Sequence, residues 1–195
     1  MNYGWIVVLI TIVFLTAFFL SGPIMSDVEK PNYEVISSDS NIEIRSYEPM
    51  IVAEVTVPGE REDAIGDGFR LIANYIFGQN EESKKIAMTA PVQQQSVGKM
   101  WNVNFVMPSE YTMDSLPSPQ TDRIDLKCVP AKNFVVIRFS GRSSKRSLSR
   151  YEKILKDYII SRKIQVVGSV KYAFYNPPWT VPFMRRNELM IEIKE

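Results

Sequence analysis

The chain has 195 residues, of which 45% are hydrophobic and 23% charged, so it is long enough for one domain with a substantial core. Its formal net charge is +1 and it contains no histidine and one cysteine. These counts exclude Ser-His and Cys-His nucleophile pairs, an intrachain disulfide and a Cys/His zinc cluster. No long run of one charge occurs, so no nucleic-acid partner is expected. The densest basic stretch holds Arg142, Lys145, Arg146 and Arg150, and we interpret it as the solvated start of a helix.

The N-terminal segment is predicted to be a transmembrane helix. Residues 3–20 carry no charge, and as a helix they would span about 27 Å, close to the thickness of a hydrocarbon core. Tyr3 and Trp5 suit the interface, and Pro23 ends the helix. The run is longer than the apolar part of a cleaved secretory signal and has neither a basic start nor a clear cleavage site. An uncleaved signal anchor over residues 1–22 is therefore favoured over a cleaved signal.

The anchor predicts a single-pass membrane protein that contacts the bilayer through residues 3–20. Residues 23–31 are expected to be a linker, and residues 32–195 a soluble domain. The Lys/Arg balance on the two sides of the run is nearly even. The default orientation then puts the N-terminus in the cytoplasm and the soluble domain on the exported side, periplasmic or otherwise extracytoplasmic.

The soluble part is predicted to open with a short strand over residues 33–37 and then to repeat itself. Three pairs of features recur at one offset of about 82 residues: residues 42–45 with 124–127, residues 50–57 with 132–139, and Gly59 with Gly141. This period is too long for a solenoid, so it indicates internal duplication.

Each half continues with an amphipathic helix and further strands. In the first helix Ile65, Phe69, Ile72 and Ile76 share one face, and Gly78 supplies the stop. The second has its stripe at Leu148, Tyr151, Ile154, Leu155 and Tyr158, with Ser143 or Ser144 as the N-cap. The later strands are expected at residues 86–92, 101–107, 169–175 and 188–193. Two such halves imply an α+β, pseudo-twofold duplicated domain with both helices against its sheet.

Two stretches resemble the signature segments of the SOUL haem-binding family. They are Lys85–Val92 (KIAMTAPV) and Tyr175–Thr180 (YNPPWT), the second followed by Arg185–Glu188 (RRNE). Their order and separation also fit, and the resemblance covers roughly residue 33 to the C-terminus. It implies a distorted eight-stranded antiparallel barrel flanked by two helices. It also implies that haem or another tetrapyrrole binds in an apolar groove beside the first helix.

The resemblance implies a cofactor-binding site made by the first helix and the Pro-rich loop. Its residues are Phe69, Ile72, Ala73, Asn74, Trp179, Phe183, Met184, Arg185 and Arg186. The two arginines offer planar donors for a propionate, or else a turn salt-bridged to Glu188. The apolar members suit a hydrophobic core equally well. Some family members use a histidine as iron ligand, so here ligation would fall to Tyr, Met or Cys.

The predicted function is non-covalent binding of haem, another tetrapyrrole or a planar hydrophobic molecule by a membrane-tethered domain. No nucleophile elbow, P-loop, dinucleotide turn or metal-ligand spacing occurs, so neither catalytic nor metal-site residues are expected. The alternative is a structural or protein-interaction scaffold at the membrane with no ligand. Gly66 and Gly68 lie inside the first helix, which either close packing or a flat ligand would explain. Cys128 is expected to be a buried thiol.

Overall fold

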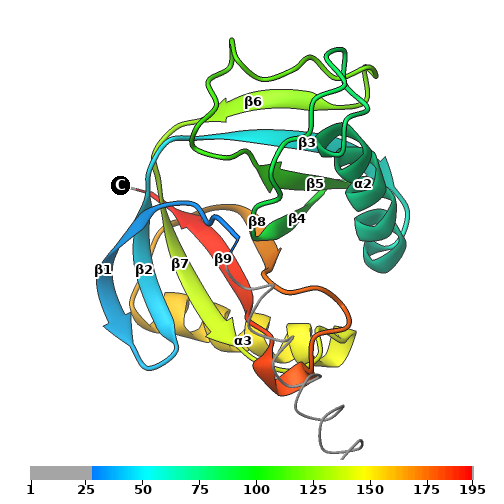
Figure 1. Cartoon of the computed structure of the whole chain (residues 1–195). Helices are drawn as coiled ribbons and strands as arrows, with labels where there is room; N and C mark the ends of the chain where they lie inside the picture. Colours follow the sequence, from blue (N-terminus) through cyan, green and yellow to red (C-terminus); the bar gives the residue numbers. More distant parts are fainter. Residues whose placement is uncertain (1–27, 195) are drawn as a thin grey trace, which may run out of the picture.

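The computed structural model describes residues 28–194 (Figure 1). The predicted anchor lies outside these residues, as does most of the linker. Within residues 28–194 no helix has the length and apolar character needed to cross a bilayer.

In the described part of the chain, nine strands form one antiparallel sheet in the order β1-β2-β7-β9-β8-β4-β5-β3-β6. Their bounds are β1 Tyr33–Asp39, β2 Ile42–Tyr47, β3 Met50–Pro58, β4 Val92–Val97, β5 Met100–Val106, β6 Asp125–Val129, β7 Lys132–Phe139, β8 Val166–Phe174 and β9 Asn187–Ile193. The α+β class is confirmed, but the eight-stranded barrel is wrong. Closure would require the two edges to pair, and instead β1 adds a ninth strand outside β2 while β6 ends the other side (Figure 1).

The strand order is symmetric about the central β8–β4 pair, apart from the added β1. β2 of the first half pairs with β7 of the second, and β6 of the second half pairs with β3 of the first. β2 and β6, the equivalent strands of the two halves, therefore each pair with a strand of the other half. The duplication predicted from the repeated segments is visible in this arrangement, and the exchange makes the two halves one folding unit.

The strand predicted over residues 86–92 is displaced. Residues 86–88, 90 and 91 have no strand pairing, and β4 begins at Val92. Proline has no N–H to donate, so Pro91 does not fit inside a strand that pairs on both sides as β4 does. The segment is held in other ways: Ile86 N donates to Ile76 O at 2.8 Å and Ala90 N to Glu29 O at 2.9 Å.

Helix α2 (Arg61–Ile76) packs on β3 and β5. Ile72 and Ile76 of the predicted stripe are buried against the sheet together with Ala64, whereas Ile65 is half-buried and Phe69 exposed. Gly78 has the left-handed φ of 110° expected of a helix stop. A Cβ on Gly68 would lie 2.6 Å from Val103 Cβ, whereas one on Gly66 would meet open space. Close packing of helix on sheet thus explains Gly68.

Helix α3 (Lys145–Ser161) packs on β7 and β9. Ser144 caps it, its hydroxyl accepting from Ser147 N at 3.3 Å. Leu148 and Leu155 are buried against the sheet, and the Tyr151 ring stacks on Phe139 at 4.0 Å. The central strands β4 and β8 lie between the two helices (Figure 1).

A third cluster fills the face of the sheet opposite the helices. It contains Tyr47, Ala90, Phe134, Val136, Ala173, Tyr175 and Met190, and Val28 packs against it. Glu29 bridges to Thr89, just before β4, and Val92 at the start of β4 pairs with Phe174 at the end of β8. The described chain therefore starts near the end of the sheet where β8 leads into Tyr175. Cys128 is exposed, which corrects the expectation of a buried thiol: it lies on β6, and an edge strand has a neighbour on one side only.

Candidate functional site

The connection from β8 to β9 is a loop with a fixed internal structure, which we call the Pro-Pro loop (residues 176–186). It includes the short 3-10 helix η1 (Pro182–Met184). Thr180 N donates to Pro177 O at 3.0 Å, and Met184 N donates to Val181 O at 2.9 Å. Arg185 Nε donates to Thr180 O at 2.7 Å, and its Nη2 also donates to Pro178 O. These bonds hold the loop in one shape.

The Pro-Pro loop is also bound to the segment before α3. Gly141 N donates to Pro182 O at 2.9 Å, and Asn187 Nδ2 donates to Gly141 O at 3.0 Å. In Figure 1 the loop with η1 lies beside the beginning of α3. Two hydrogen bonds to Gly141 therefore fix the C-terminal half of the loop on the domain.

Three large apolar side chains of the loop point away from the protein. Trp179 and Phe183 are each 70% exposed, and Met184 is 42% exposed. Arg185 is half-buried because it holds the loop carbonyls. A rigid loop that presents aromatic rings to solvent is typical of a contact surface.

The predicted helix residues divide between surface and core. Phe69 is 36% exposed, and its ring lies 5.4 Å from that of Phe105. Asn74 is exposed as well. Ile72 and Ala73 lie on the buried side of α2, where they pack in the core instead of facing solvent.

An apolar row on the helix side of the sheet runs from Phe105, beside the Phe69 ring, to Phe174 at the end of β8. Val92 on β4 pairs with Phe105 on β5 and with Phe174 on β8, so the three side chains share one face. Val92 and Phe174 are half-buried, and the Pro-Pro loop begins two residues after Phe174. We call the resulting surface the α2–loop face, defined by Phe69, Val92, Phe174, Trp179, Phe183 and Met184.

Polar contacts close the space between the starts of the two helices. Arg61 Nη2 reaches Ser143 O at 3.5 Å, and its guanidinium lies 5.8 Å from the Tyr172 ring centroid. Tyr172 donates to Glu152 at 3.2 Å, and burial together with Glu152 raises the pKa of Tyr172 to about 12. Beneath Arg61, the fully buried Gln94 donates to Arg61 O at 2.7 Å, while its Oε1 has no hydrogen-bond partner among residues 28–194.

Arg186 belongs to a buried ion cluster, as in the salt-bridge reading of the sequence. Its Nε donates to Glu188 Oε1 at 2.9 Å, and its guanidinium lies 3.9 Å from the Tyr175 centroid. Arg45 binds the same carboxylate with two bonds of 3.0 and 3.1 Å. Burial opposes the charge on Arg45, but its bonds to Glu188 outweigh that effect and raise its pKa. Arg186 is thus engaged within the protein.

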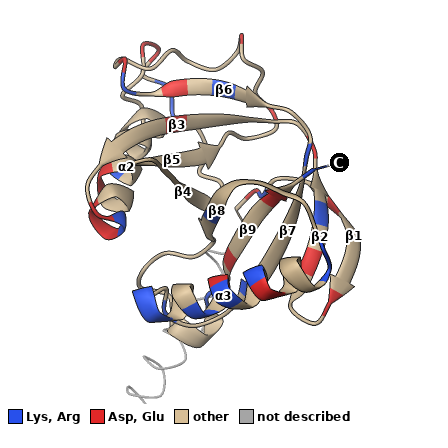
Figure 2. Cartoon of the chain, turned by 180° about the vertical axis from the view of Figure 1, so that it is seen from behind, with Lys and Arg blue, Asp and Glu red and all other residues tan. Residues whose placement is uncertain are grey.

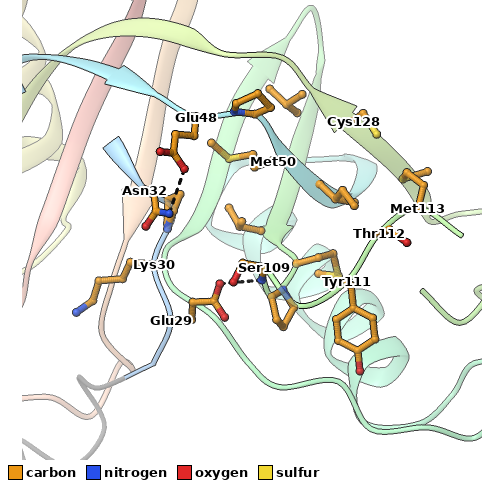
Figure 3. A pocket seen from close by; sticks show the side chains of 17 residues that line it. Glu29, Lys30, Asn32, Glu48, Met50, Ser109, Tyr111, Thr112, Met113 and Cys128 are labelled. Carbon is orange, nitrogen blue, oxygen red and sulfur yellow. Dashed lines mark hydrogen bonds between the residues drawn. The ribbon is translucent and has the colours of Figure 1, made fainter. Parts of the chain in front are cut away.

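Two cavities lie elsewhere, where residues 29–32 cross the β2–β3 corner, and their volumes are about 430 and 460 Å³. In the first, Ser109 N donates to Glu29 at 2.8 Å and Asn32 donates to Glu48 at 3.1 Å (Figure 3). Its lining includes Met50, Met107, Tyr111, Met113 and Cys128. Sequence reasoning missed this cavity because its walls come from four separate segments that share no local motif.

The amino-acid sequence of most of the chain matches a known family. A family model described as SOUL heme-binding protein matches residues 28–192. The chain belongs to the SOUL family. The search of curated proteins finds no match.

Solved structures share the fold of this SOUL domain. The C-terminal domain of EcmrR superposes with a TM-score of 0.61 at 11% identity, over 84% of this chain and 98% of that one. A hydrolase from Listeria innocua gives 0.53 at 12% identity, over 82% and 94% of the two chains. An uncharacterized conserved protein from the same organism gives 0.55 at 15% identity, over 81% and 94%. These similarities show the fold alone.

Proposed function

We propose that this SOUL domain binds haem, another tetrapyrrole or a similar planar apolar molecule on the α2–loop face, non-covalently and without catalysis. The family supports the ligand class. The proposed location of the ligand rests on Trp179 and Phe183, which are each 70% exposed on a hydrogen-bonded loop. This loop follows Phe174, the last residue of the apolar row that begins near Phe69. Aromatic rings at such a surface can pack on the plane of a macrocycle.

The residues present fit the macrocycle better than the iron. The chain has no histidine, and on the α2–loop face Met184 is the exposed sulfur. Arg185 and Arg186 bind carbonyls and Glu188, so a propionate would instead meet the exposed Arg142 or Lys145 next to the loop. We therefore propose that burial of apolar surface, with cationic contacts to carboxylates, provides the affinity.

Titration of the full chain in nanodiscs tests this proposal. Haem and iron-free protoporphyrin IX should both saturate at one equivalent with similar affinity, because iron ligation contributes little. Phe69→Asp and Phe183→Asp should each weaken binding by about tenfold or more. Ile160→Asp is the matched control, because Ile160 is 74% exposed at the far end of α3. Non-saturating uptake that survives both variants would favour the ligand-free scaffold.

The 430 Å³ cavity is a second location for the same function, because its size falls in the range of small-molecule pockets. Met50→Trp would fill it. Loss of titration in this variant, with normal binding in Phe69→Asp, would move the site to the cavity and remove the α2–loop face from the proposal.

The membrane part of the proposed function is that residues 1–22 remain as an anchor and hold the domain on the extracytoplasmic side. The uncharged run at residues 3–20 supports it. Resistance to alkaline carbonate extraction tests the anchor, and protease access in sealed vesicles tests the side.

A further inference from the structure

We propose that the Pro-Pro loop and the first turn of α3 dock on the surface of an anionic bilayer, the membrane that carries the N-terminal segment. This inference rests on the membrane part of the proposed function. It adds an orientation: the loop end of the α2–loop face, with Trp179, Phe183 and Met184, meets the lipid.

The loop has the side chains of an interfacial contact. Trp179, Phe183 and Met184 are exposed together on a segment of six residues whose backbone is held by internal hydrogen bonds. Tryptophan is favoured at the headgroup level, where one side of its ring meets lipid and the other meets water. Because the loop is already ordered, inserting its tip requires little additional ordering.

Cations flank these apolar residues. Gly141 is bonded to Pro182 of η1, so Arg142 follows directly beside the loop, with Lys145 and Arg146 in the first turn of α3. All three are exposed, and none has an ion pair with a carboxylate of the described chain. Figure 2 shows the Lys and Arg colouring at this end of α3. Basic side chains next to exposed apolar ones suit an anionic lipid surface.

Acidic residues limit the surface on one side. Arg61 in the first turn of α2 bonds to Ser143 O, and the same turn carries Glu62 and Asp63. These carboxylates are exposed and would be repelled by anionic headgroups. The docked surface is therefore the loop side of Ser143, not the α2 side.

The start of the described chain lies at the same end of the domain. Val28 packs against the cluster that contains Tyr175, the residue before the Pro-Pro loop, and Glu29 O accepts from Ala90 N. Residues 21–27 can span at most about 25 Å when fully extended. A membrane segment that ends at Leu20 therefore keeps this end of the sheet close to the bilayer. A planar apolar ligand dissolved in the lipid could then reach Phe183 without crossing water.

A site-specific fluorophore on the full chain tests the orientation. Cys128 is the only cysteine, so Cys128→Ser provides a background for single labels. The chain is placed, one copy per disc, in nanodiscs of phosphatidylcholine and phosphatidylglycerol. There an NBD group at Phe183→Cys should emit at shorter wavelength than one at Ile160→Cys. It should also be quenched several-fold more by nitroxide-labelled acyl chains. Trp179→Cys is the second loop position, in case Phe183→Cys alters the loop.

Two double variants with the same charge change test whether docking requires the basic residues beside the loop. Arg142→Glu combined with Lys145→Glu should abolish the shift at Phe183→Cys, and so should nanodiscs of phosphatidylcholine alone. Lys153→Glu combined with Lys156→Glu makes the same charge change farther along α3, where both lysines pair with acids, and should leave the shift intact.

The results of these experiments distinguish a chain that fails to dock from a chain that has no membrane anchor. A chain that resists carbonate extraction but carries a water-exposed label at both loop positions has its anchor and does not dock, which overturns the inference alone. Extraction by carbonate overturns the tether and the docking together. Shielding that appears only when two copies share a disc assigns the loop to a second copy of the chain and also overturns it. Haem titration reports separately on the ligand.

Discussion

The two halves of the sheet differ in the connection between two equivalent pairs of strands, β4–β5 and β8–β9. In the first half β4 and β5 are joined by Gly98 and Lys99 alone, with Gly98 at a φ of 62°, the left-handed conformation of a tight hairpin. At the equivalent place in the second half, β8 and β9 are joined by residues 175–186. The duplicated scaffold thus needs only a tight turn here, and the longer loop with its exposed rings is an addition. A feature that the fold does not need is the better candidate for function.

The largest expected effect is at the base of the added loop. Glu188→Gln removes the carboxylate shared by Arg45 and Arg186 and leaves their charges buried with less compensation. The free energy of unfolding should fall by about 3–5 kcal/mol in urea titration. The neighbouring Glu192→Gln, which breaks a partly exposed pair with Lys132, should cost less than about 1 kcal/mol. Equal losses would mean that the buried cluster does not secure the loop.

A second effect follows from the phenol of Tyr47, whose oxygen accepts a hydrogen bond from Arg45 Nη1 of the same cluster at 3.1 Å. Burial and the Glu188 carboxylate raise its pKa from 10.0 to about 12. The neutral phenol therefore stabilises the fold fully below pH 10, and this contribution, about 2–3 kcal/mol, is lost as the pH rises from 10 to 12. Urea unfolding across this window should show a smaller decline in Tyr47→Phe than in the parent. An identical decline would show that other tyrosines carry the alkaline transition.

A third effect distinguishes two glycines of α2, one that faces the sheet and one that faces solvent. Gly68→Ala places a Cβ against Val103 and should destabilise the protein by about 1–3 kcal/mol in the same assay. Gly66→Ala, two residues away on the same helix, meets open space and should stabilise by about 0.5–1 kcal/mol. Similar results for both would place a ligand, not the sheet, as the reason for Gly68.

The smallest change in stability is expected where the change in function should be greatest. Trp179→Ser with Phe183→Ser removes two exposed side chains and should alter the unfolding free energy by no more than about 0.5 kcal/mol. Porphyrin binding should nevertheless be lost. Val97→Ser, at the corresponding hairpin of the first half and also exposed, should change neither quantity. If the loop variant unfolds easily, the rings belong to the scaffold.

Local chemistry predicted the elements and the family. The apolar stripes placed α2 and α3, Ser144 and Gly78 placed their ends, and the repeated segments revealed the duplication, because each signal depends on neighbours in the chain. The two motifs led to the SOUL family, which the match over residues 28–192 shows. Such features follow from periodicity and backbone preference, which are properties of a short stretch of residues.

Tertiary structure decided what depends on distant partners. Whether the sheet closes depends on how its two edges meet, so the barrel and the burial of Cys128 were wrong. The role of Arg186 depends on Glu188, which Arg45 approaches from a strand far away in the sequence. Of the predicted site, Phe69 and the loop residues lie at the surface, whereas Ile72 and Ala73 lie in the core. The same helix thus contributes residues to the surface and to the core, and only the packing of other elements determines which of them stay in contact with solvent.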